Sequence, residues 1–221
     1  MPEFWEKDFT CPFCGRSFSQ VRVFSSAIVV ERRDEDLKPY FKGVNSLLFQ
    51  TVTCPGCYFT AFEKDFEAME VPEEKRKDVQ RVLDNARKEF GELNLSENRS
   101  VEDGIKLLSI TAAIYTVLGK RMGAARAYLI LAWLFREVGK KKEELTALAR
   151  ALKCFEDHYR NDIVSDEEEP MILFYLGEIN RRLGNRNEAV KWFSTLVNKY
   201  KGSPSPYVKA AKENWQLVRG E

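Results

Sequence analysis

The spacing of apolar residues along the chain changes near residue 71. Before it, β-branched and aromatic residues cluster in residues 20–30 and 47–53, which predicts two strands. After it, apolar residues recur every three or four positions on a charged background, which predicts amphipathic helices. The expected helices cover, approximately, residues 72–90, 100–118, 121–138, 141–159, 165–184, 186–200 and 206–218.

Two Cys-x-x-Cys pairs flank the predicted strands. They supply four thiols: Cys11, Cys14, Cys54 and Cys57. Two such turns can form a tetrahedral cage for one Zn²⁺, and an S₄ cage also accepts iron, which is the minor alternative. The order of turn, strand, excursion, strand and turn predicts a zinc ribbon with an enlarged hairpin. Four cysteines fill the coordination shell, so the expected zinc is structural.

Small residues recur in the helical part. Gly177, Gly184, Ala189 and Phe193 match the tetratricopeptide pattern best, with weaker copies upstream. The predicted fold class is therefore α+β, mostly α, with a small N-terminal zinc-ribbon β-module followed by a tetratricopeptide-like array of helical hairpins. The expected division is residues 1–71 for the zinc-ribbon module, 72–99 for an amphipathic connecting helix and linker, and 100–221 for the helical domain.

The composition narrows the possible partners. Among 221 residues, 35 Lys and Arg balance 34 Asp and Glu, which argues against a general nucleic-acid binder. The start resembles no signal peptide, and no apolar run is long enough to span a membrane. We therefore expect a cytoplasmic protein without membrane contact, whose paired thiols stay reduced and bind metal rather than forming disulfides.

A charged segment over residues 31–40 joins the two predicted strands. It is either a solvated loop or a recognition surface for a protein partner. The possible partner-binding residues are Arg32, Arg33, Asp34, Asp36 and Tyr40.

Other candidate chemistry is sparse. Cys154 and His158 share a helix face, but the single histidine lacks a third group, so packing is the favoured interpretation. The chain contains no Gly-rich phosphate loop of standard form, and no complete catalytic group can be assembled.

Several stretches resemble a family of uncharacterised bacterial proteins that is grouped under a domain of unknown function. The similar residues are Cys11-Pro12-Phe13-Cys14-Gly15, Arg33-Asp34-Glu35-Asp36, Pro39-Tyr40, Leu48 through Tyr58, and Ala132-Trp133-Leu134-Phe135-Arg136-Glu137. Members carry an N-terminal Cys₄ segment followed by helices. The resemblance implies a cytoplasmic bacterial protein with a bound metal, and it implies no activity.

The leading hypothesis is a non-enzymatic zinc-binding adaptor or scaffold that binds a protein partner. The alternatives are a zinc-ribbon nucleic-acid-binding protein, which would need a local basic face, and a zinc–thiolate redox sensor. An enzyme is the least favoured class.

Overall fold

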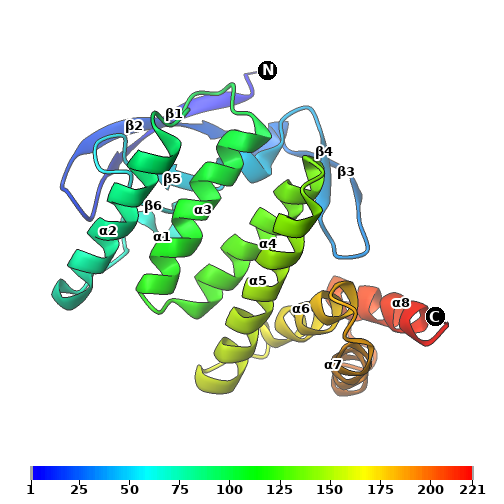
Figure 1. Ribbon diagram of the computed structural model, residues 1–221. Helices are drawn as coiled ribbons and strands as arrows, with labels where there is room; N and C mark the ends of the chain where they lie inside the picture. The colour runs from blue at the N-terminus through cyan, green and yellow to red at the C-terminus, as the bar shows by residue number, and fades with distance from the viewer. Residues whose placement is uncertain (1, 221) are drawn as a thin grey trace.

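The computed structural model describes residues 2–220 and confirms the α+β, mostly α class. Six strands form three separate antiparallel pairs in the first 62 residues, and the rest is helical (Figure 1). The strands are β1 (Phe4–Thr10), β2 (Ser17–Val23), β3 (Val29–Arg33), β4 (Pro39–Lys42), β5 (Thr51–Thr53) and β6 (Thr60–Phe62). The helices are α1 (Glu63–Phe66), α2 (Glu73–Phe90), α3 (Val101–Val117), α4 (Arg121–Glu137), α5 (Lys141–Asn161), α6 (Glu169–Arg182), α7 (Arg186–Lys199) and α8 (Pro206–Gly220).

The strand pairing differs from the enlarged hairpin that the sequence predicted. Each cysteine turn closes its own hairpin, β1–β2 or β5–β6, and the excursion between them forms a third hairpin, β3–β4. Strands β1, β4 and β6 were not predicted. The apolar run Leu47–Phe49 is not a strand, because it lies in a 3₁₀ turn (Ser46–Phe49) whose start is capped by the Asn45 side chain.

Strand β2 still lies beside β5, but side chains replace the expected backbone ladder. The buried Gln20 carboxamide accepts a hydrogen bond from the Thr53 amide at 2.9 Å. The buried Arg22 guanidinium donates to the Thr51 carbonyl at 3.1 Å. These polar side chains point inward from β2, so the apolar alternation that would have revealed the pairing is missing from the sequence.

The helices agree closely with the predicted ranges. Ser100 and Asp103 form a full capping box at the start of α3, as their spacing suggested. Predicted turns occur at Gly119, Gly139 and Gly184, each with a positive φ that glycine adopts without strain. The helix predicted over residues 165–184 begins four residues late, at Glu169, because residues 166–168 form a turn first.

Helices α3, α4 and α5 pack side by side, and α6, α7 and α8 form a second group that continues from α5 (Figure 1). Gly177 of α6 lies against the ring of Phe193 in α7, where an added Cβ would come within 2.6 Å of the ring. This close approach is what the pattern in the last unit predicted. The assignment of the whole array to the tetratricopeptide type, and the division into the three expected segments, stay predictions.

One apolar core runs through both halves of the chain, from Phe9 in β1 to Val218 in α8. Helix α2 packs on α3, and Tyr115 of α3 contacts the β6–α1 junction: its ring lies 5.7 Å from that of Phe62. The strand hairpins are therefore held against the helices by buried side chains as well as by the connecting chain.

Candidate metal centre

The two cysteine turns have the same backbone geometry. In the first, the Gly15 amide donates to the Cys11 carbonyl at 2.9 Å, and in the second the Tyr58 amide donates to the Cys54 carbonyl at 2.9 Å. Such a turn directs both of its thiols to one side. The two turns face each other, so the structure brings together all four predicted cysteines.

The four sulfur atoms lie within 4.8 Å of one another. Cys11 Sγ is 3.6 Å from Cys57 Sγ, and Cys14 Sγ is 3.7 Å from Cys54 Sγ. A tetrahedral zinc with Zn–S bonds of about 2.3 Å places its sulfur atoms about 3.8 Å apart. These separations fit a shared metal ion, and they are far longer than a disulfide bond of about 2.05 Å.

The second turn places a non-glycine residue in the left-handed region. Gly15 has φ 76° in the first turn, and Tyr58 has φ 70° at the equivalent position. A side chain in this conformation costs about 1–2 kcal/mol. Tyr58 has compensating contacts, because its hydroxyl donates to the Gly91 carbonyl at 2.9 Å and the Arg87 guanidinium lies 5.2 Å from its ring centre.

Cationic side chains from α2 contact both turns. Arg76 donates to the Phe13 carbonyl at 2.9 Å, and Arg87 donates to the Gly56 carbonyl. A divalent metal held by four thiolates has a net charge of −2, so nearby guanidinium groups stabilise it. Of the four cysteines, Cys14 alone is exposed, while the other three are buried.

The thiols influence one another's protonation. The hydrogen bond with Cys54 raises the pKa of the Cys11 thiol, and the same contact lowers the pKa of the Cys54 thiol. Four thiolates at these distances repel one another, so a cation among them is needed for all four to be deprotonated. The donor set and its spacing therefore fit a metal ion. Within residues 2–220 this is the one group of three or more potential ligands that converges in this way.

The charged segment 31–40 lies in the β3–β4 hairpin, whose β3 residues are all exposed. Arg32 stacks on the Tyr40 ring, with its guanidinium carbon 3.5 Å from the ring centre, and both side chains contact Asp34. Arg33 donates to the Leu37 carbonyl across the hairpin tip. Four of the five possible partner-binding residues therefore contact one another or the hairpin's own backbone.

The fifth, Asp36, is buried against the helices and is 1% exposed. Its carboxylate accepts hydrogen bonds from Trp133 Nε1 at 3.0 Å and Arg136 Nη2 at 2.6 Å, both from α4. Arg182 of α6 lies 3.3 Å away. In this conformation Asp36 is unavailable to an outside partner, because its partners lie in the same chain.

The helical side of this contact was not predicted from the sequence. Glu178 of α6 is fully buried and binds Arg181, Arg182 and Asn214. The available signal was the number of charged residues at core-facing positions of α4 and α6.

Cys154 and His158 lie far along the chain and join no metal cluster among residues 2–220. Burial raises the pKa of the Cys154 thiol, which disfavours the thiolate that a nucleophile needs. His158 Nδ1 is 2.8 Å from Asp162 Oδ2, in an ordinary pair one helical turn apart.

Comparison with known proteins identifies the family. A model of the family described as "Uncharacterized protein conserved in bacteria (DUF2225)" matches residues 4–218, so the chain belongs to this family. An uncharacterized protein of Borreliella burgdorferi (strain ATCC 35210 / DSM 4680 / CIP 102532 / B31) is 24% identical over 159 residues. The match covers 63% of this chain and 55% of that protein, so the chain spans about half the length of this curated relative. No solved structure gives a significant match.

None of the helices described has the length and apolar character that crossing a bilayer requires.

Proposed function

We propose that this member of the family is a non-enzymatic zinc-binding adaptor, in which one structural zinc ion joins the two cysteine turns. The observation that supports it is the sulfur quartet, whose separations of 3.6 and 3.7 Å match a ZnS₄ centre. Four protein ligands leave no open position for water or substrate, as in structural zinc sites. A reduced cytoplasm, where thiolates persist, belongs to the same proposal.

The zinc stabilises a module that has little regular structure to hold it. Strands β5 and β6 have three residues each, and an isolated two-stranded hairpin is marginal in water. Apart from the Gln20 and Arg22 side chains, the metal is the main polar connection between the two cysteine hairpins. Metal binding is therefore coupled to folding of the N-terminal module.

Metal analysis of the purified chain tests this proposal. We expect one zinc per chain, and we expect Cys11→Ser and Cys57→Ser to lose the zinc together with N-terminal structure. Cys154→Ser is the matched control and keeps the metal. Full zinc occupancy in Cys11→Ser or Cys57→Ser would show that these cysteines are not the zinc ligands. One iron per chain in place of zinc would change the identity of the metal in the proposal but not its four cysteine ligands.

The adaptor role is supported by an uneven distribution of exposed apolar side chains. Seven large hydrophobic residues are exposed in the described chain, and five of them lie within its first 30 residues. These five are Trp5, Phe24, Ile28, Val29 and Val30. The rings of Trp5 and Phe24 are 6.1 Å apart, and the others follow directly along the chain. Grouped exposed apolar residues are typical of interaction surfaces.

Affinity purification with a matched pair of variants tests this surface. We expect proteins that co-purify with the intact chain to be lost from the Val29→Ser, Val30→Ser double variant. They should remain with Ile163→Ser, which alters an apolar residue that is 99% exposed and far along the chain from this group. If both variants co-purified with the same set of proteins, β3 would not be an adaptor surface. That result would leave the zinc proposal standing, because zinc occupancy does not depend on Val29 or Val30.

A further inference from the structure

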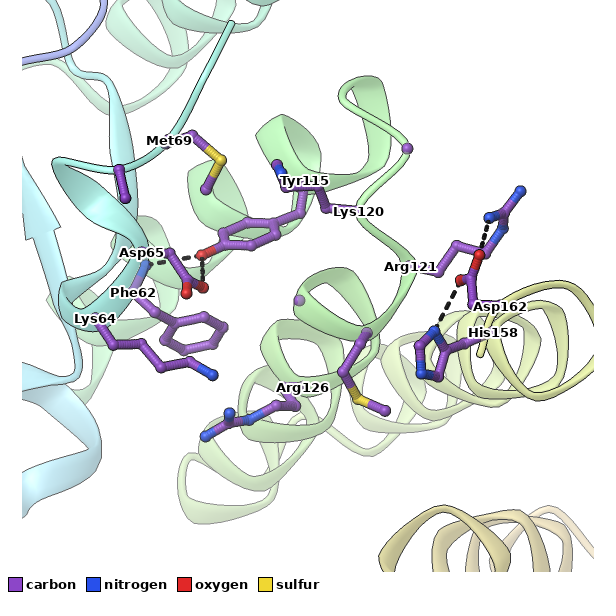
Figure 2. Close-up of a pocket in the computed structure, with 14 residues that line it drawn as sticks. Phe62, Lys64, Asp65, Met69, Tyr115, Lys120, Arg121, Arg126, His158 and Asp162 are labelled. Carbon is purple, nitrogen blue, oxygen red and sulfur yellow. Dashed lines mark hydrogen bonds and ion pairs between the residues drawn. The ribbon is translucent and has the colours of Figure 1, made fainter. Parts of the chain in front are cut away.

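A cavity of about 400 Å³ lies where α1 and the α3–α4 turn meet the end of α5 (Figure 2). One wall consists of Phe62, Asp65 and their neighbours, and another of residues 119–123 at the start of α4. His158 and Asp162 close the side toward α5. The volume is in the range of sites for small molecules.

The charged side chains around this cavity are mainly basic. Lys64, Lys120, Arg121 and Arg126 all line it, against two carboxylates. Both carboxylates are already bound within the chain. Asp65 accepts a 2.6 Å hydrogen bond from the Tyr115 hydroxyl, and Asp162 accepts a 2.9 Å hydrogen bond from Arg121.

Arg126 is the most informative of these residues. Arg126 is half-buried, yet its side chain makes no hydrogen bond and no ion pair with the described residues. Every other arginine in residues 2–220 that is not exposed makes at least one such contact. Its guanidinium lies 5.5 Å from the ring centre of Phe62. It also lines an adjoining cavity of about 620 Å³, whose other charged residues are Lys7, Arg22, Lys64, Glu63 and Glu67. A guanidinium so placed has five donors available for a ligand.

Two of the other three cations, the exposed Lys64 and Lys120, are unpaired as well. Lys64 and Lys120 make no ion pair with the described residues. Figure 2 shows Lys64 and Arg126 reaching from different elements toward the same space beside Phe62. The first turn of α4 holds no acidic residue and no side-chain cap, although an acid there would complement the helix dipole. A bound anion would offset each of these unbalanced positive charges.

We propose that this cavity binds a small molecule bearing a phosphate group. Arg126 binds the phosphate in bidentate fashion, Lys64 and Lys120 add charge, and Phe62 packs against the rest of the ligand. Three unpaired cations favour a doubly charged phosphate over a singly charged carboxylate. This site is separate from the cysteine cluster and does not depend on the zinc or adaptor proposals.

Calorimetric titration of the full zinc-loaded chain at constant ionic strength tests the site, with inorganic phosphate and phenyl phosphate as probes. We expect saturable binding of both, and tighter binding of phenyl phosphate because of Phe62. Arg126→Gln should weaken phosphate binding about tenfold or more, since charge-assisted hydrogen bonds are lost. Lys64→Gln should weaken it less.

The control is Arg186→Gln, which changes an exposed arginine on α7 whose side chain makes no hydrogen bond or ion pair with the described residues. It should bind phosphate like the unaltered chain. Without phosphate, Arg126→Gln should melt at the same temperature as the unaltered chain, because Arg126 has no polar partner among residues 2–220 to lose. Absence of saturable binding, or equal affinity in Arg126→Gln and the unaltered chain, would overturn the proposal.

Discussion

Replacing Asp36 by asparagine should strongly destabilise the chain, because this buried carboxylate fixes the β3–β4 hairpin on the helices. The substitution preserves shape and keeps an oxygen that can accept from Trp133, but it removes the charge that faces Arg136 and Arg182. Asp36 is 1% exposed, so water cannot replace the lost interaction at the hairpin side. On the helix side, both guanidinium groups keep a second carboxylate, Glu144 or Glu178.

The magnitude follows from these contacts. Removing one member of a fully buried ion pair costs about 3–5 kcal/mol. The side chains of Arg136 and Arg182 are each 19% exposed and partly hydrated, so the lower part of the range applies. We expect Asp36→Asn to lower the free energy of unfolding by about 3 kcal/mol. For a chain of this size, that corresponds to a fall in melting temperature of roughly 6–12 °C.

Urea unfolding of the zinc-loaded chain, followed by circular dichroism, measures this difference. The matched control is Glu35→Gln, which removes the charge next along the chain. Glu35 pairs with Arg181 at 2.6 Å, but its side chain is 54% exposed, so its loss should cost less than about 1 kcal/mol. Equal destabilisation by the two substitutions would refute the view that the buried carboxylate fixes the hairpin on the helices.

Two other predictions follow from the helical half. Gly177→Ala should destabilise the chain by about 1–3 kcal/mol, although alanine has the better helix propensity, because the new methyl would meet the Phe193 ring. Urea unfolding should show that the Gly177→Ala, Phe193→Leu double variant regains part of this stability. No regain would contradict the steric explanation. Burial alone would raise the pKa of Glu169, but hydrogen bonds from Lys199, Tyr200 and Tyr159 hold that pKa below its usual value. The ionised Glu169 therefore stabilises the chain fully above about pH 5, and this stabilisation is lost as the pH falls through the lowered pKa. The unfolding midpoints of the unaltered chain and of Glu169→Gln should accordingly converge in acid. A constant difference between the two midpoints would contradict a stabilising role for the ionised carboxylate.

The helices could be predicted because their signals are local. The capping box of Ser100 and Asp103 and the glycine at the end of each of several helices lie within a few residues of the ends that they mark. The cysteine quartet was equally accessible, because a repeated Cys-x-x-Cys spacing is typical of metal sites and is seldom needed for packing. In both cases the signal is a short motif whose residues are neighbours in sequence, although the two cysteine motifs are far apart along the chain.

The strand pairing and the hairpin contact could not be predicted, because they depend on residues far apart. Gln20 and Arg22 are polar, and only the position of β5 explains why they point inward. Asp36 lies in a run of charges typical of a solvated loop, and its partners Trp133 and Arg136 follow about a hundred residues later. A pattern of apolar positions contains no record of such polar contacts.

Because each cysteine turn closes its own hairpin, a shared metal ion would act as a cross-link between distant points of the chain. It would join Cys14 to Cys54 and make residues 15–53 a closed loop, with Asp36 near its midpoint. A cross-link across a loop of this length removes entropy from the unfolded chain worth about 4 kcal/mol. The metal would thereby raise the effective concentration of the hairpin tip near α4 and α6. Metal capture and hairpin docking would then be thermodynamically linked, and loss of the ion would loosen a contact among helices to which it is not bound.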